Sequence, residues 1–276
     1  MSGFSPSSSV LRDEGLVVHR IADGGRALIA LSGGVDSAVV AALAFEALGK
    51  DTVAVTLRGP AVAQVEVDRA ERVAREIGIP HQLLTVDPLE RAEYRANPTN
   101  RCYFCRSVEA GRLLSFGKEW GAHQYLDGIH TDDYSDDRPG LRAMDEAGFR
   151  HPLAEEGWTK ADVRHAARSH HLGNADQPSD ACLASRVAYG NPIDLSLLAR
   201  IEAAESILLE QGFRRVRVRV RGEDARIEVD PSEVPRLSTA PLSSEILASV
   251  RSLGFGSVVI DPKGYGRRPA PAGVAP

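Results

Sequence analysis

The sequence has no apolar stretch that approaches the roughly 20 residues needed to cross a lipid bilayer. Its serine-rich first ten residues also lack the basic region followed by an apolar region that marks a signal peptide. Both absences predict a cytoplasmic protein without a membrane-spanning segment. The 276 residues, 43% of them hydrophobic, are enough for one large domain and a smaller one.

Basic residues are not in excess, because 33 lysines and arginines stand against 38 acidic residues, and the formal net charge is −5. This charge argues against a general polyanion-binding surface, so no nucleic acid is expected as a partner. Cysteine is also scarce. Three cysteines cannot all pair, and a cytosolic chain seldom keeps disulfides, so the three thiols are candidates for metal binding or thiolate chemistry.

Neither of the two most common phosphate-binding loops, G-x₄-G-K-[ST] and G-x-G-x-x-G, follows the first predicted strand, residues 27–31. The residues found there instead are Ser32, Gly33, Gly34, Val35, Asp36 and Ser37. The glycine pair lets the backbone approach an oxyanion, and the free N–H groups of the helix that follows face the same loop. We predict that this loop binds phosphate; a glycine turn without a ligand is the alternative.

Strands and helices alternate in the pattern that follows this loop. We expect strands at residues 27–31, 52–57, 82–86 and 124–126, and helices at 38–48, 62–77 and 102–120. This rhythm predicts the α/β class, with a doubly wound parallel sheet that binds ligands at the carboxyl ends of its strands. Ser32 lies at one such end, and Asp127 and Gly128 lie at another.

The rest of the chain is predicted to finish this domain and form a smaller α+β domain. Residues 129–156 are polar and predicted to be a functional loop, and residues 159–171 a helix capped by Thr159. Helices at 194–211 and 245–253 and strands at 215–220, 225–229 and 257–260 follow. The predicted division is a disordered N-terminus (1–14), the phosphate-binding domain (15–189), the small domain (190–263) and a loose tail (264–276).

The cysteines are arranged as a C-x₂-C motif, Cys102 and Cys105, and a distant third, Cys182. Three thiolates without a fourth protein sulfur suit a [4Fe–4S] cluster with one open iron better than a closed tetrahedral zinc site. Three alternatives stay open: zinc completed by a histidine, a nucleophilic or sulfur-donating Cys182 without a cluster, and inert packing of the thiols.

Arginines gather in two places. Arg217 and Arg219 alternate with valines on a predicted strand, so they share one face, and a row of guanidinium groups suits a mononucleotide phosphate. An edge strand guarded by charge is the alternative. Arg186 follows Cys182 closely and would stabilise the negative charge that develops on a phosphate, unless it is an ordinary surface arginine.

The segment after residue 128 contains Asp132, Asp133 and Asp137. These aspartates either organise a nucleotide-binding loop or only keep it solvated.

Taken together, these motifs resemble a known family. The hexapeptide from Ser32 to Ser37 resembles the PP-loop of the N-type ATP pyrophosphatases, although Ala38 replaces a frequent serine or threonine. The full set resembles the LarE sulfur transferases of the nickel-pincer nucleotide pathway. The other motifs that carry this resemblance are residues 101–105, 126–128, 137–141, 182–186 and 216–219.

The resemblance implies that ATP adenylates a carboxylate of pyridinium-3,5-biscarboxylate mononucleotide, with release of pyrophosphate, and that sulfur then replaces AMP. Members with three cysteines hold a [4Fe–4S] cluster that carries an extra sulfide, whereas members with only the cysteine matching Cys182 give up their own sulfur. This chain matches the first type, and the second stays the alternative. A homo-oligomer and a downstream nickel-insertion protein are the expected partners.

The resemblance also implies roles for single residues. Asp36 would help place Mg²⁺ on the phosphates of ATP, and Arg217 and Arg219 would form the pocket for the substrate's phosphate. Arg186 matches a position near the active site. Glu205 and Glu228 match acidic positions linked to a metal or catalytic site, but a glutamate taken alone more often lies on a solvated helix or strand face.

Three other functions remain possible. A tRNA thiolase of the PP-loop class would share the use of ATP, but it would be expected to show a basic stripe or an added RNA-binding domain. An amidating ligase, such as an NAD or GMP synthetase, needs no set of three cysteines. A nucleotide sensor would bind ATP without cleaving it.

Overall fold

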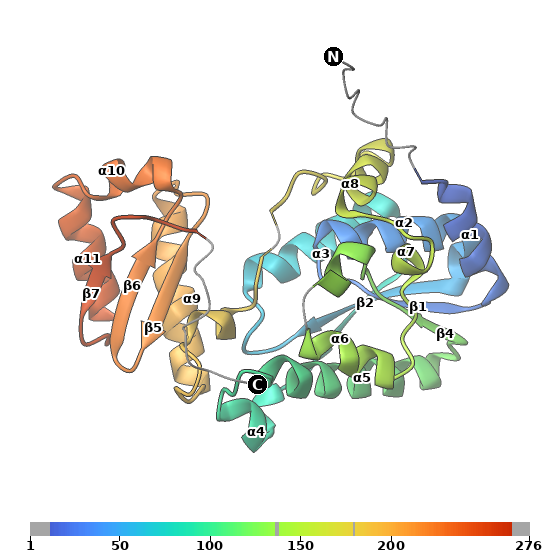
Figure 1. The fold of residues 1–276 in the computed structure, drawn as a ribbon, viewed down its shortest axis with the longest axis horizontal. Helices are drawn as coiled ribbons and strands as arrows, with labels where there is room; N and C mark the ends of the chain where they lie inside the picture. Colours follow the sequence, from blue (N-terminus) through green and yellow to red (C-terminus); the bar gives the residue numbers. More distant parts are fainter. Residues whose placement is uncertain (1–11, 136–137, 179, 267–276) are drawn as a thin grey trace, which may run out of the picture. The chain divides into compact units, whose positions relative to one another are not determined.

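The computed structural model describes residues 12–135, 138–178 and 180–266, and these form two compact units (Figure 1). Unit 1 runs to Tyr94 and resumes over Asn100–Asp180. Unit 2 consists of Arg95–Thr99 and the residues from Ala181 onward. The domain limits drawn from the sequence stay predictions. Asp136, Asp137 and most of the two predicted tails lie outside the described residues.

Unit 1 is built on a parallel sheet with the strand order β3–β2–β1–β4. Its strands are β1 (Ala27–Ala30), β2 (Thr52–Arg58), β3 (His81–Thr85) and β4 (Gln124–Leu126). The predicted doubly wound parallel sheet is confirmed. The chain moves outward from β1 through β2 to β3 and then returns to place β4 on the other side of β1. The switch point, where such sheets bind ligands, therefore lies between the carboxyl ends of β1 and β4.

Helices cover both faces of this sheet (Figure 1). Ala27 and Ile29 of β1 pack into a core with α1 (Glu14–Asp23), α2 (Val35–Leu48), α3 (Gln64–Ile77) and α8 (Lys160–Ser169). Leu28 packs on the opposite side with α5 (Arg101–Trp120) and α6 (Pro139–Glu146). Because both faces are covered, β1 and β2 are buried along most of their length instead of alternating between buried and exposed residues.

The prediction of a loop over residues 129–156 is wrong, because this segment contains helical structure. A 3-10 helix spans Thr131–Ser135, and α6 and α7 (Pro152–Glu155) follow. Pro139 and Pro152 occupy the first positions of these helices, where the missing N–H is not needed and the fixed φ favours a helix. The segment contains many aspartates, and the short apolar face of α6 therefore gives no clear helical pattern in the sequence.

Short elements complete the connections of unit 1. They are the 3-10 helices η1 (Gly49–Asp51) and η2 (Pro88–Glu90) and the helix α4 (Ala92–Arg95).

None of the helices in the described part of the chain is both long enough and apolar enough to span a membrane.

Unit 2 contains a three-stranded sheet in the order β5–β6–β7. Strands β5 (Arg217–Arg221) and β6 (Asp224–Glu228) are antiparallel, and β7 (Val258–Ile260) is parallel to β6. The other elements are α9 (Leu195–Glu210), α10 (Val234–Leu237), α11 (Leu242–Ser252), η4 (Leu183–Arg186) and η5 (Pro231–Glu233).

The segment Arg95–Thr99 belongs to unit 2 through hydrogen bonds that no local pattern indicates. The backbone N–H of Ile193 donates to the carbonyl of Arg95 at 2.8 Å. The buried side chain of Asn97 donates to the carbonyls of Ala188 and Asn191 at 2.9 and 3.0 Å. The chain therefore enters unit 2 briefly, returns to unit 1 for α5, and enters unit 2 again after residue 180.

Candidate functional site

The loop after β1 forms a compact cradle at the start of α2. The hydroxyl oxygen of Ser37 accepts a hydrogen bond from the N–H of Ser32 at 3.2 Å and donates to the carbonyl of Gly34 at 3.1 Å. The helix begins at Val35, two residues before Ser37, and no side chain caps it. Its first N–H groups and the positive end of its dipole are therefore available to an anion.

The predicted glycines permit close packing around this cradle. Gly33 has a φ of +80°, and a Cβ atom there would lie 2.9 Å from the backbone nitrogen of Ala70 in α3. A Cβ on Gly128 would lie 2.4 Å from the backbone nitrogen of Ser37. The end of β4 is thus packed directly on the first turn of α2, and Asp127 is brought to the same switch point as the cradle.

A lysine that the sequence analysis missed completes the cradle. The Nζ atom of Lys160 donates to both carboxylate oxygens of Asp36, at 2.6 and 2.7 Å. Lys160 is the first residue of α8 and follows Thr159, the predicted cap, which forms a capping box with Asp162. The capping box fixes where α8 begins, but no sequence signal connects Lys160 with Asp36. The ammonium group places positive charge beside the predicted phosphate site.

The acidic segment after β4 folds back to the cradle. His130 is buried between two carboxylates: its Nε2 lies 3.6 Å from Asp36 Oδ1 and its Nδ1 lies 3.5 Å from Asp133 Oδ2. Asp132 accepts a hydrogen bond from the backbone N–H of Lys160 at 2.9 Å. Asp132 and Asp133 are therefore part of the arrangement around Asp36 and Lys160.

A second buried histidine, His151, contacts the predicted site residue Asp127. The Nδ1 atom of His151 lies 2.6 Å from Asp127 Oδ1, and its Nε2 lies 2.7 Å from Asp145 Oδ1. Burial lowers the pKa of His151, but the hydrogen bonds and charges of Asp127 and Asp145 outweigh it and raise the pKa to about 9. The ring is therefore an imidazolium at neutral pH. Neither His151 nor Asp145 is predicted from the sequence, because an isolated histidine or aspartate forms no recognisable motif.

The cysteine pair lies at the start of α5. Cys102 and Cys105 are three positions apart, so their side chains project from the same side of the helix. Cys102 is exposed and Cys105 is half-buried, with its thiol 3.2 Å from Glu109 Oε1. The three cysteines, all of them described, are in no disulfide. Two thiols one turn apart suit a shared iron–sulfur group, for which they would be two of the ligands.

Cys182 lies in unit 2, directly before η4, and its backbone is held by the predicted residue Arg186. The Arg186 guanidinium donates to the carbonyl of Cys182 at 3.0 Å, contacts the carbonyl of Ala181, and pairs with both oxygens of Glu205 at 2.8 and 2.9 Å. Glu205 also accepts from the backbone N–H of Val218 at 2.9 Å. Arg186 is buried, not a surface residue.

Arg219 holds the same segment from β5. It donates to the carbonyl of Ser185 and to Glu228 Oε2, each at 3.1 Å. Glu228 is fully buried. Unit 2 therefore brings together Cys182, Arg186, Glu205, Arg219 and Glu228, and in this arrangement both glutamates pair with arginines. Their assignment to a metal or catalytic site stays a prediction.

Arg217 lies on the same face of β5 as Arg219, as predicted from the alternation with valines, which are buried. Its guanidinium carbon lies 5.4 Å from the centre of the Tyr265 ring, and that of Arg215 lies 5.3 Å from the same ring. The assignment of Arg217 and Arg219 to a phosphate pocket stays a prediction.

Within the described residues, no group of three or more histidine, cysteine, aspartate or glutamate side chains lies close enough to hold a metal ion. The fit of single residues can still be assessed. Asp36 offers carboxylate oxygens, the donors that Mg²⁺ prefers, next to the phosphate cradle. Both of these oxygens already accept from Lys160 Nζ, so the magnesium role of Asp36 stays a prediction.

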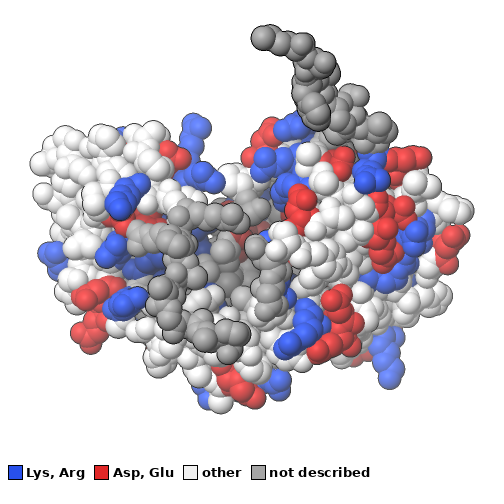
Figure 2. Space-filling view, viewed as in Figure 1, with Lys and Arg blue, Asp and Glu red and all other residues white. Residues whose placement is uncertain are grey.

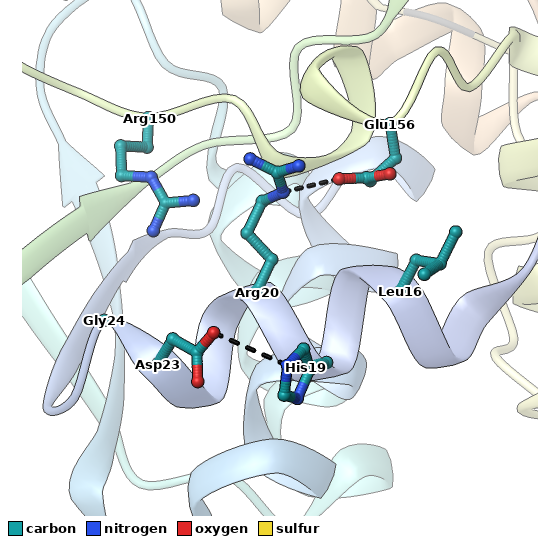
Figure 3. Close-up of a pocket in the computed structure, with 7 residues that line it drawn as sticks. All are labelled: Leu16, His19, Arg20, Asp23, Gly24, Arg150 and Glu156. Carbon is teal, nitrogen blue, oxygen red and sulfur yellow. Dashed lines mark hydrogen bonds and ion pairs between the residues drawn. The ribbon is translucent and has the colours of Figure 1, made fainter.

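A pocket of about 510 Å³ lies elsewhere in unit 1, and none of the predicted site residues lines it (Figure 3). Its charged residues are already paired: Arg20 with Glu156, and His19 with Asp23 at 3.6 Å. Arg150 also lines it and pairs with Glu155 at 2.7 Å. This pocket has no features of the predicted chemistry.

Known proteins resemble the chain in sequence and fold. The NAD synthase family model matches residues 17–105. An uncharacterised protein from Synechocystis is 38% identical and covers 87% of this chain and 90% of its own length. The structure of NMN synthetase from Francisella tularensis shares the fold, with a TM-score of 0.51 at 18% identity over 64% of this chain and 76% of that chain.

A further relative has a named activity. The pyridinium-3,5-bisthiocarboxylic acid mononucleotide synthase of Lactiplantibacillus plantarum is 32% identical over 250 residues, which cover 90% of this chain and 90% of that protein. The similarity therefore includes both units. The position of the cradle after β1 agrees with this similarity, because the cradle lies at the switch point of the sheet, as in a PP-loop fold. The chain belongs to the LarE family of ATP-dependent sulfur transferases, within the PP-loop superfamily.

Proposed function

We propose that this protein adenylates a carboxylate of pyridinium-3,5-biscarboxylate mononucleotide with ATP, releases pyrophosphate, and then replaces AMP with sulfur to give the thiocarboxylate. A carboxylate is a poor electrophile until one of its oxygens becomes part of a good leaving group, and the acyl-adenylate provides that group. The observation that carries the proposal is the cradle of α2 with Lys160 beside Asp36, in a chain that matches its LarE relative over 90% of both lengths.

The residues of unit 1 would act on the phosphates of ATP. The N–H groups at the start of α2 would bind phosphate oxygens, and the Lys160 ammonium would neutralise part of the charge that pyrophosphate carries away. Asp36 would hold Mg²⁺, which would supply further charge neutralisation when bound. Asp127 would position the nucleotide at the end of β4.

Cys102, Cys105 and Cys182 would be the ligands of a [4Fe–4S] cluster, which when bound would supply sulfur to the activated carboxyl group. The two cysteines of α5 support this role because they project from one side of the helix. Arg186 and Arg219 would fix the backbone around Cys182, since both donate to carbonyls of residues 182–185. Arg217 would bind the substrate's phosphate. A homo-oligomer and transfer of the product to a nickel-inserting protein complete the proposal.

Release of pyrophosphate tests the adenylation step. Protein purified without oxygen is mixed with ATP and Mg²⁺, with and without the pyridinium mononucleotide, and pyrophosphate is measured. We expect release only when the pyridinium compound is present, and a loss of release in Asp36→Asn but not in the control Asp68→Asn, an exposed aspartate of α3. Release with tRNA instead of the pyridinium compound would replace this proposal with a tRNA thiolase. On the face drawn in Figure 2, basic and acidic side chains are interspersed over unit 1, which argues against that alternative.

Mass spectrometry tests the source of the sulfur. We expect the mass of the protein to be unchanged after turnover, together with about four irons per chain in the purified protein and loss of iron in Cys102→Ser. A loss of about 34 Da at Cys182, the mass of H₂S, would show that Cys182 gives up its own sulfur. An active preparation without iron would also overturn the cluster.

A further inference from the structure

His151 joins two parts of unit 1 that contain predicted site residues. It lies directly before α7, and its side chain is only 7% exposed. One ring nitrogen contacts Asp127, at the end of β4, and the other contacts Asp145, on α6, at 2.6 and 2.7 Å. Because both contacts are short and both partners are carboxylates, the ring orientation is fully determined.

The contact with Asp127 fixes one oxygen of this carboxylate and leaves the other available. Asp127 Oδ1 accepts from His151 and from the backbone N–H of Ile129, the latter at 3.2 Å. Within the described part of the chain, Asp127 Oδ2 accepts no hydrogen bond. The next residue, Gly128, packs on the backbone of Ser37 in the cradle. The free oxygen is therefore held in a defined place next to the predicted ATP site.

The contact with Asp145 extends this arrangement to the cysteine helix. Asp145 lies on α6, which packs against α5. The close approach of the two helices is at Gly140, where a Cβ atom would lie 3.5 Å from the Cβ of Cys102 and 3.1 Å from Arg106 Cγ. A single imidazolium thus links the end of β4 to the helix that covers Cys102.

The groups around His151 are mostly acidic, so a positively charged imidazolium ring stabilises this part of unit 1. Glu155 of α7 accepts from the backbone N–H of His151 at 3.2 Å and pairs with Arg150 at 2.7 Å. Burial and the negative charges of Asp145 and Asp127 also raise the pKa of the nearby Tyr134. Asp127 and Asp145 would repel each other without the imidazolium between them.

We propose that His151 is a positioning residue for nucleotide binding: it holds the Asp127 carboxylate so that Oδ2 accepts a hydrogen bond from a hydroxyl group of the nucleotide, and it anchors this carboxylate to α6 through Asp145. The inference rests on the proposed function, because it assumes that ATP binds at the cradle. It concerns binding, so it predicts an effect on the affinity for ATP that exceeds any effect on the pyridinium substrate.

Calorimetry with Mg²⁺ and ATP tests the first part. We expect His151→Phe to raise the Kd for ATP about tenfold, because Asp127 loses a charged donor. His151→Asn, whose side-chain N–H can replace the donor to Asp127, should bind within about threefold of the wild type, and Asp145→Asn should lie between the two. The control is His170→Phe, which removes another histidine–carboxylate contact of unit 1, with Glu14 at 2.9 Å.

The binding measurements distinguish a failure of the proposed function from a failure of the positioning role of His151. Failure of the wild type to bind ATP would overturn the proposed function. Binding by the wild type that is unchanged in His151→Phe would overturn only the positioning role. If His151→Phe does not fold, ¹⁵N NMR of the histidine rings in the wild type decides: we expect added Mg²⁺ and ATP to shift the His151 signals and leave those of His170 in place. Unshifted His151 signals at saturating ATP would contradict the inference.

Discussion

At the scale of the residue, Lys160 determines the charge of the phosphate cradle. Replacing it with methionine keeps the length of the side chain but leaves the Asp36 carboxylate without its partner, so the cradle would repel the phosphates of ATP. We expect Lys160→Met to lower kcat/KM for ATP about 100-fold in a pyrophosphate-release assay. Lys50→Met, at an exposed position of η1, is the control. A change of less than threefold in Lys160→Met would exclude the role.

His151 gives the folded state a pH dependence that can be measured. Its two carboxylate partners raise its pKa from the ordinary histidine value of 6.5 to about 9 in the folded protein. A pKa raised by folding stabilises the protein fully below about pH 6.5 and progressively less as the pH rises through 9. We expect the free energy of unfolding in urea to fall by on the order of 2 kcal/mol more in the wild type than in His151→Asn between pH 6.5 and 9.5. Equal slopes for the two proteins would contradict this.

A residue of the site can be predicted from the sequence when the residues that it acts with are its neighbours along the chain. The residues from Ser32 to Ser37, and Cys102 with Cys105, have their chemistry in adjacent positions, so the pattern is visible in the sequence. Lys160 and His151 act on Asp36 and Asp127, 124 and 24 positions away. Such contacts follow from the order of the strands and the packing of α8 and α7, which no local periodicity specifies.

At the scale of the element, the contact of β4 with α2 depends on Gly128. A Cβ atom at this position would overlap the backbone of Ser37, and that backbone is fixed by the core of α2. We expect Gly128→Ala to destabilise the protein by about 1–3 kcal/mol and to weaken ATP binding. The matched control is Gly111→Ala, in the middle of α5, where nothing lies within 4 Å of the added methyl group. It should stabilise the protein by about 0.5–1 kcal/mol.

Both glycine variants are measured by urea unfolding and by calorimetry with ATP. Unchanged ATP binding in a folded Gly128→Ala would show that the end of β4 can move away from the cradle without consequence.

The elements of unit 1 also show where sequence patterns are sufficient. The strands of the sheet and the helices α2, α3 and α5 are predicted within a few residues. The three helices each end at a glycine, which marks their limits in the sequence. Helix α6 is not predicted, because it has only eight residues and buries only Ala143 and Met144. Its position is fixed by packing against α5, which is a contact between elements.

At the scale of the whole molecule, the two units should divide the substrates between them. The cradle with Asp36 and Lys160 belongs entirely to unit 1, and Arg217 belongs to unit 2. The segment Arg95–Thr99, which joins unit 2 although it precedes α5, could not be predicted, since its partners lie some 90 positions later in the chain. The chain therefore passes between the units three times, and each unit contributes its own set of charged residues to the proposed reaction.

This division predicts opposite effects on the two Michaelis constants. We expect Arg217→Gln to raise KM for the pyridinium mononucleotide about tenfold, because one charge-assisted contact with its phosphate is lost, and to leave KM for ATP within twofold. Lys160→Met should show the reverse pattern. The control within unit 2 is Arg251→Gln, at an exposed position of α11, which should change neither constant. Equal effects of Arg217→Gln on both constants would mean that Arg217 stabilises unit 2 through Tyr265 instead of binding substrate.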